Sequence, residues 1–145
     1  VPLTVENPRY NYKAYSSAFT DGWETDTNIK YLRYAEVLLM KAEALNELGQ
    51  TTEAIPLLNQ IRTRAGLANT TAVLQGDVRT AIWKERRVEM AMEHDRFFDL
   101  VRTGQAQAAF AVDGKTFVTG KHELFPLPQA FIAQTGGLST QNPGY

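Results

Sequence analysis

The chain has 145 residues and a formal net charge of −1, with 15 Lys and Arg against 16 Asp and Glu. That length suits one domain with a real hydrophobic core, and the balanced charge gives no basic surface that would indicate nucleic-acid binding. The sequence has no cysteine, which excludes disulfides, thiol catalysis and cysteine-ligated zinc. It also lacks the apolar run of about 18 residues that a membrane-spanning helix needs.

The N-terminal zone, residues 1–27, is expected to be irregular, with a turn indicated at Asp21-Gly22. It is rich in aromatic side chains. Exposed loop aromatics can stack on the apolar faces of sugar rings, so Tyr12, Tyr15 and Trp23 are candidates for carbohydrate contact. The alternative is that these rings anchor a loop that has little other structure.

Residues 28–111 are expected to be helical. At the start of this zone, apolar residues recur at three- and four-residue steps, as one face of an amphipathic helix requires: Leu32, Ala35, Leu39, Ala42 and Leu45. A second apolar series ends before Gly66. The sequence therefore predicts an antiparallel pair of helices at residues 28–49 and 52–65, with Gly49 in the turn.

The spacing within this pair is typical of a tetratricopeptide unit. Ala42 and Ala54 are small residues at positions where the two helices should approach most closely, and Gly49 makes the turn. Pro56 fits the second helix if Thr52 is its N-cap. A single unit of this kind leaves an apolar face uncovered, and the pattern does not identify a ligand.

A third helix is predicted to begin at the cap Asp77 and to run as far as Met92. Residues 112–145 are expected to be loop-rich, because turn residues recur there and the prolines at 126 and 128 exclude a helix over 124–128. The fold class is thus all-α, a tetratricopeptide-like hairpin plus additional helices with a loop-rich C-terminal segment, in one domain or fragment over residues 1–145.

The segment that follows residue 84 is the densest in charged side chains. Glu85, Glu89 and Glu93 form an i,i+4 stripe, which could hold a metal or act as the acid and base of a hydrolase. However, Glu85 and Glu89 fall in an otherwise apolar helical row, and buried charges are normally paired. Arginine can bind a carboxylate through two hydrogen bonds, and Arg62, Arg64, Arg86, Arg96 and Arg102 are nearby in sequence. We therefore expect a structural charge network formed by Glu85, Arg86, Glu89 and Arg96.

His94 is one of only two histidines in the chain. A catalytic role is disfavoured because no serine lies in a Gly-x-Ser-x-Gly elbow. A metal site is disfavoured because the other histidine, His122, is remote in sequence. Histidine is enriched among the non-glycine residues that adopt positive φ, so His94 is expected to end a helix. No catalytic residue, metal site or cofactor is predicted.

Four motifs occur in the same order in a known family: Arg33–Asn46, Glu85–Arg102, Gly120–Pro128 and Gln141–Tyr145. Over residues 28–145 the chain resembles the C-terminal region of the SusD/RagB family of outer-membrane nutrient-binding lipoproteins. The resemblance implies a non-enzymatic protein on the outer surface of the cell. It also implies binding of a glycan or another nutrient, and a partner that is a TonB-dependent transporter.

Members of that family are longer and carry a lipidated N-terminal Cys, so the resemblance implies a C-terminal fragment that acts mainly as framework. Trp23 and Tyr15 are the only residues that we expect to touch carbohydrate directly. The alternative interpretation is a tetratricopeptide-like scaffold for protein–protein interaction with no glycan site of its own.

Overall fold

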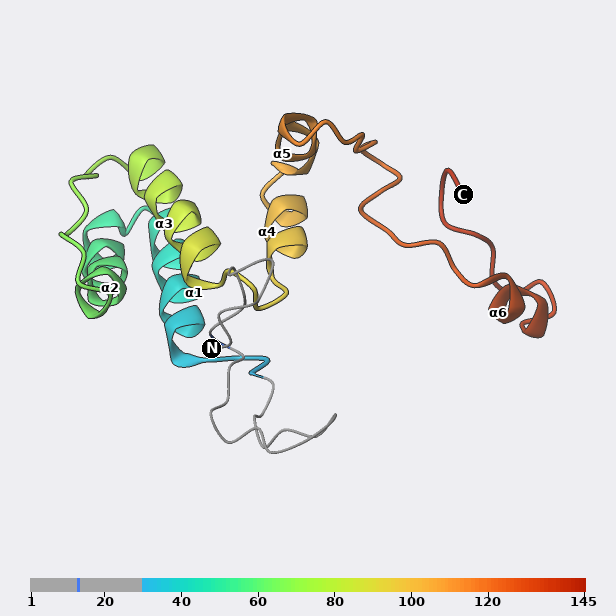
Figure 1. Ribbon diagram of the computed structural model, residues 1–145, viewed down its shortest axis with the longest axis horizontal. Helices are drawn as coiled ribbons and strands as arrows, with labels where there is room; N and C mark the ends of the chain where they lie inside the picture. Colours follow the sequence, from blue (N-terminus) through green and yellow to red (C-terminus); the bar gives the residue numbers. More distant parts are fainter. Residues whose placement is uncertain (1–12, 14–29) are drawn as a thin grey trace, which may run out of the picture. The chain divides into compact units, whose positions relative to one another are not determined.

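The computed structural model describes Lys13 and residues 30–145. This part of the chain contains helices and no strand (Figure 1), which confirms the predicted all-α fold class. The helices are α1 (Tyr34–Glu47), α2 (Thr51–Arg64), α3 (Gln75–Glu89), α4 (Arg96–Arg102), α5 (Ala106–Val112) and α6 (Gln129–Gln134). They belong to two compact units, the first ending at Asp95 and the second beginning at Arg96. None of the described helices is long and apolar enough to cross a membrane.

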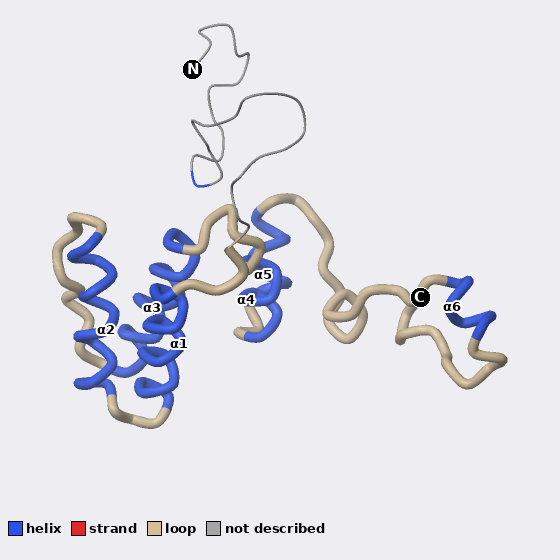
Figure 2. The backbone as a smooth tube through the Cα atoms, turned by 90° about the horizontal axis from the view of Figure 1, so that it is seen from below, coloured by secondary structure: helices blue, strands red, loops and turns tan. Residues whose placement is uncertain are grey.

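In the first unit, α1 and α2 form the predicted antiparallel pair, and α3 packs on both of them, mainly on α1 (Figure 2). The turn between α1 and α2 depends on Gly49, whose φ is 80°. This left-handed conformation ends α1 and lets the Gln50 N–H donate to the Leu45 carbonyl at 2.8 Å. The hairpin therefore forms for the reason that the sequence indicated.

The core of the first unit lies between these three helices. Ala42 and Ala54 are both fully buried in it, as expected for the small residues of a tetratricopeptide-like hairpin. The other buried members are Leu38, Leu39, Leu58, Ile61, Val78 and Ile82. Because α3 contributes its apolar face to the same cluster, it covers one side of the hairpin.

The boundaries of the first two helices differ from the prediction. α1 begins at Tyr34 rather than at residue 28, because Arg33 is extended, with φ −142° and ψ 160°. α2 begins at Thr51, so Thr52 is not its N-cap and Pro56 lies in the sixth position of the helix. Pro56 and Thr52 are both exposed, so the Thr52 carbonyl that loses its helical donor lies at a solvent-facing part of the helix.

α3 begins two residues before the predicted cap Asp77 and ends at Glu89 rather than at Met92. Its start is fixed by α1, since the Asn46 Nδ2 donates to the Gln75 carbonyl at 3.0 Å. It cannot continue through Met92 and His94, because their φ values are 67° and 73°. His94 has the expected positive φ, but it lies in the link between α3 and α4 rather than at the end of a helix.

The second unit has a smaller core. Leu100, Ala106 and Phe117 are buried together, with Phe97 and Phe110 packed against them. α6 is a short helix within the segment that was expected to be loop-rich. It follows Pro128, which can precede a helix because its fixed φ suits the first turn.

The C-terminal residues of the second unit are held by hydrogen bonds to the proline-containing segment. The Gln141 side chain accepts from the Leu127 N–H at 2.7 Å and donates to the Leu127 carbonyl at 2.9 Å. The Tyr145 hydroxyl donates to the Leu124 carbonyl at 3.0 Å. A Cβ at Gly144 would lie 2.9 Å from the Lys121 side chain, so the backbone at residue 144 lies close against that side chain.

Candidate functional site

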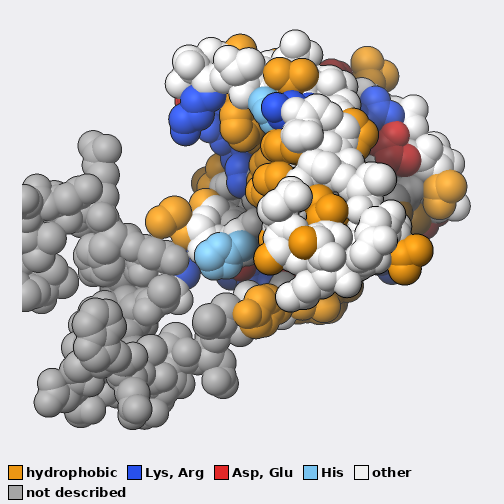
Figure 3. All heavy atoms as spheres, turned by 90° about the vertical axis from the view of Figure 1, so that its right-hand side faces the viewer, with side chains coloured by type: hydrophobic (Ala, Val, Ile, Leu, Met, Phe, Trp, Pro, Cys, Tyr) orange, Lys and Arg blue, Asp and Glu red, His pale blue; other side chains and the backbone are white. Residues whose placement is uncertain are grey.

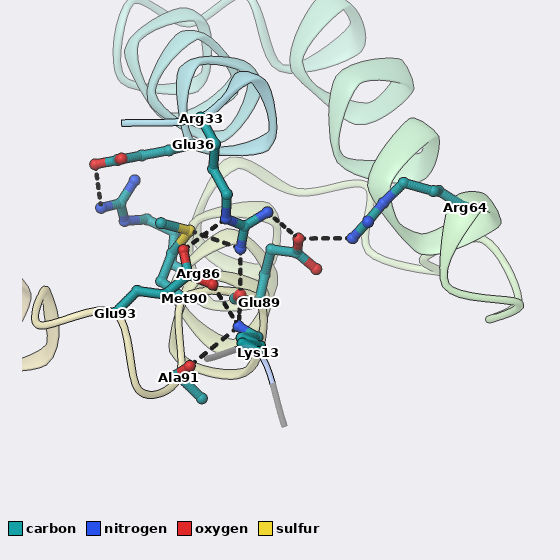
Figure 4. Close-up of polar contacts among 9 residues, drawn as sticks. All are labelled: Lys13, Arg33, Glu36, Arg64, Arg86, Glu89, Met90, Ala91 and Glu93. Carbon is teal, nitrogen blue, oxygen red and sulfur yellow. Dashed lines mark hydrogen bonds and ion pairs between the residues drawn. The ribbon is translucent and has the colours of Figure 1, made fainter. Parts of the chain in front are cut away.

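Three cationic side chains, those of Lys13, Arg33 and Arg64, bind at the C-terminal end of α3 in the first unit (Figure 4). Glu89 is the last residue of α3, and Glu93 follows it in the link to α4. A helix leaves its last carbonyls without donors and carries a partial negative charge at this end. Cations are therefore favoured there even before the two carboxylates are considered.

Arg33 is the centre of this arrangement. Its Nη1 donates to Glu89 Oε1 at 2.5 Å and its Nε to Glu93 Oε2 at 2.6 Å. Its Nη2 donates to the backbone carbonyl of Glu89, which the helix leaves free. The Arg33 side chain is only 20% exposed, so one guanidinium joins the start of α1 to the end of α3 in a largely buried place.

Two further cations complete the group. Lys13 Nζ donates to the carbonyls of Glu89 at 2.6 Å and Ala91 at 3.0 Å, and to Glu93 Oε1 at 2.6 Å. Arg64, the last residue of α2, donates from Nη2 to Glu89 Oε1 at 2.6 Å. We call these five residues, Lys13, Arg33, Arg64, Glu89 and Glu93, the α3 clasp, because they tie α1, α2 and Lys13 to one helix end.

The charges in the α3 clasp stabilise one another. Partial burial alone would raise the pKa of Glu93, but hydrogen bonds from Arg33 and Lys13 outweigh it and lower the pKa below its usual value. Burial opposes the charge on Arg33 in the same way, and the bonds to Glu93 and Glu89 raise its pKa nevertheless. Both groups therefore stay ionised near neutral pH.

Two more ion pairs lie along α3. Glu85 is buried, and its Oε2 accepts from Arg62 Nη1 at 2.7 Å. Arg86 is also buried and lies 3.7 Å from a carboxylate oxygen of Glu36 on α1. The polar side of α3 is thus bound to both other helices of the first unit by charged groups, beside the apolar core.

This arrangement supports a structural role more readily than a chemical one. A general acid needs a carboxyl group whose pKa is raised towards neutrality, whereas the pKa of Glu93 is lowered. Glu89 accepts hydrogen bonds from two arginines. In the described part of the chain, no group of three or more His, Cys, Asp or Glu could hold a metal ion.

The structure brings together some of the expected residues. Glu85 and Glu89 are both largely buried and bonded to arginine, and Arg86 lies in a separate buried pair. Arg96 is the first residue of α4, in the second unit, and is exposed. The proposed carbohydrate contacts Trp23 and Tyr15 lie outside the described residues.

Sequence reasoning missed Arg33, Lys13 and Glu93 as members of the group. One signal was present for Arg33, which occupies the N-cap of α1 without a capping hydrogen bond. Ser, Thr, Asp and Asn are the residues that favour this position, so an arginine there indicates a role outside its own helix. No comparable signal distinguishes Lys13, because its partners are three functional groups about 80 positions away.

Comparison with known proteins gives the family. The family model described as SusD family matches residues 6–145. The chain belongs to the SusD family. A curated relative, SusD-like protein P2 of Formosa agariphila, is 34% identical over a match that covers 99% of this SusD-family chain and 31% of the relative. Two others from that organism are matched over 18% of their length, so the chain spans less than a third of these relatives.

Solved structures agree with this assignment. A SusD superfamily protein from Bacteroides vulgatus has a TM-score of 0.72 and 31% identity, over 81% of this chain and 27% of that one. Surface glycan-binding protein A from Bacteroides thetaiotaomicron has a TM-score of 0.69 and 28% identity, over 79% of this chain and 24% of that one. The SusD-family fold is therefore shared with these two proteins, and about three-quarters of the length of each lies outside the match.

Proposed function

We propose that this SusD-family chain is part of a bacterial outer-membrane protein that binds glycans or other nutrients at the cell surface. It hands them to a TonB-dependent transporter and catalyses no reaction on them. The observation that carries this proposal is the match of the family model to residues 6–145. The likeness to a protein named for surface glycan binding supports a glycan as the ligand.

Within such a protein, this chain serves mainly as framework. The buried pairs along α3 and the α3 clasp use charged side chains to hold helices together, which supports this role. Direct contact with carbohydrate falls to Trp23 and Tyr15, whose aromatic rings can stack on sugar rings. Two such contacts contribute roughly 1 kcal/mol each beyond the buried area, which is too little to offset the cost of ordering a ligand.

Calorimetry of the 145-residue chain against soluble starch, xylan and laminarin tests this proposal. We expect binding weaker than about 1 mM, or none. The variant Trp23→Ala provides the test residue, and Tyr31→Ala is the matched control because Tyr31 is an exposed aromatic on the described surface. Micromolar binding that is lost in Trp23→Ala and kept in Tyr31→Ala would contradict the framework role.

A further inference from the structure

Lysine side chains on a protein surface are ordinary, and Lys and Arg lie at several separate places on the face of the molecule drawn in Figure 3. Lys13 is distinguished by its acceptors. Its Nζ lies within 3.0 Å of three oxygens, the carbonyls of Glu89 and Ala91 and Oε1 of Glu93. We call these three oxygens the ammonium cradle. An ammonium group has three N–H donors and no acceptor, so the cradle offers one acceptor for each donor.

The backbone after α3 is shaped so that the three oxygens of the cradle face one nitrogen. The Glu93 N–H donates to the Met90 carbonyl at 3.1 Å, which closes a four-residue turn. Met92, at the third position of that turn, has a φ of 67°, a left-handed conformation that glycine or asparagine normally supplies in a type II turn. A methionine keeps such a conformation only where its surroundings determine it. The turn therefore indicates a site built around a ligand.

The charges around the cradle favour a singly charged cation. The last carbonyls of a helix carry a partial negative charge, and Glu93 adds a full one. Arg33 already binds the other carboxylate oxygen of Glu93 at 2.6 Å, so its guanidinium would repel a divalent ion placed in the cradle. A second guanidinium would present its donors in a flat fork, which does not match three oxygens around one nitrogen. A primary ammonium fits both the charge and the donor geometry.

We propose that the ammonium cradle is a binding site for primary alkylammonium groups and that Lys13 is its tethered occupant. A tethered group binds at an effective concentration in the millimolar range, so a small amine in solution should enter the cradle when the lysine side chain is removed. Through this site, residue 13 is fixed to the end of α3, 76 positions away in sequence. The proposal rests on the contacts of Lys13 and is independent of glycan binding.

Chemical rescue tests the class of ligand. Lys13→Ala should lower the urea midpoint of the 145-residue chain by about 0.5 M, and about 0.1 M methylammonium chloride should restore roughly half of that loss. Tetramethylammonium chloride at the same concentration carries the same charge without an N–H donor, so it should restore none. Lys84→Ala, which removes an exposed lysine on α3, is the control and should show neither loss nor rescue. Equal effects of the two salts on Lys13→Ala, or no loss in that variant, would overturn the proposal.

Acetylation kinetics test the same contact in the wild-type chain, so the proposal stays testable even where Lys13→Ala fails to fold. An amine must leave its hydrogen bonds before it attacks an acylating reagent. Limited acetylation read by peptide mass spectrometry should therefore find Lys13 at least about fivefold less reactive than Lys84. Glu93→Gln removes the charged acceptor of the cradle and should raise the Lys13 rate about threefold or more, with the Lys84 rate unchanged. Equal rates at Lys13 and Lys84 in the wild-type chain, or a Lys13 rate that Glu93→Gln leaves unchanged, would contradict the proposal.

Discussion

Arg33 shows at the residue scale how a side chain next to one helix can stabilise another. As the N-cap of α1 it makes no capping hydrogen bond, although residues that do so typically stabilise a helix by about 1 kcal/mol. Its guanidinium instead binds two carboxylates and a free carbonyl at the end of α3. The start of α1 therefore lacks a side-chain cap, and the same residue instead connects α1 to α3 within the first unit.

His94 offers a test of backbone strain. Its φ of 73° is unfavourable for a residue with a Cβ. His94→Gly should therefore raise the free energy of unfolding by about 1 kcal/mol. Ala91→Gly, in the same link between α3 and α4, should lower it, because there the change adds only freedom to the unfolded chain. Urea denaturation of both variants checks this, and a destabilised His94→Gly would show that the imidazole makes a needed contact.

Glu93 should make stability depend on pH in the acid range. Its pKa is lower in the folded chain than in the unfolded one, so it contributes stability above the unfolded value of about 4.3. This contribution is lost as the pH falls through the folded pKa. Glu93→Gln should cost about 2 kcal/mol at pH 7, and its difference from wild type should shrink below about pH 4.

Urea denaturation between pH 7 and pH 3 measures this difference. Glu53→Gln is the control, because Glu53 is an exposed carboxylate on α2. Because Glu53 lies in the first turn of α2, where a carboxylate contributes about 0.3–1 kcal/mol, Glu53→Gln should cost clearly less at pH 7 than Glu93→Gln. A gap between wild type and Glu93→Gln that stays constant down to pH 3 would mean that Glu93 is not stabilised as an anion.

At the element scale, the sequence predicted the helices whose apolar period is regular and missed the details set by distant side chains. The α1–α2 hairpin followed from period, small residues and Gly49. The start of α3 could not be predicted in this way, because it depends on hydrogen bonds between Asn46 and Gln75. The end of α3 could not be predicted either, because no feature of the neighbouring sequence indicates that Met92 has a positive φ. α6 was missed because six residues are too few to establish a period.

Asn46 is the residue through which three elements of the first unit meet. It is fully buried, its Oδ1 accepts from Thr51 Oγ1 at 3.0 Å, and its Nδ2 donates to the Gln75 carbonyl at 3.0 Å. Asn46→Ala should lower the free energy of unfolding by about 2–3 kcal/mol, since it leaves buried polar groups without partners. Gln60→Ala, at an exposed site on α2, should have little effect. Thermal and urea denaturation distinguish the two, and an equally stable Asn46→Ala would contradict the role of Asn46 at this junction.

For the molecule as a whole, the candidate site was only partly predictable. The sequence indicated that Glu85 and Glu89 need arginine partners, because they fall in an apolar row. It could not say which of the nearby arginines each carboxylate would bind. The choice of Arg33, Arg62 and Arg64 depends on how three helices pack, which sequence spacing does not encode. Family membership adds the biological context, and the charged groups of α3 are the physical basis of the proposed framework role.

A double-mutant cycle between Arg33 and Glu89 tests this central claim most directly. Urea denaturation of Arg33→Ala, Glu89→Ala and the double variant gives the coupling free energy between α1 and α3. We expect about 2 kcal/mol, because both side chains are largely buried. The more exposed pair Arg79 and Glu47 is the control and should show a smaller coupling, at most about 1 kcal/mol. Coupling between Arg33 and Glu89 as small as that of the control would contradict the structural role of the α3 clasp.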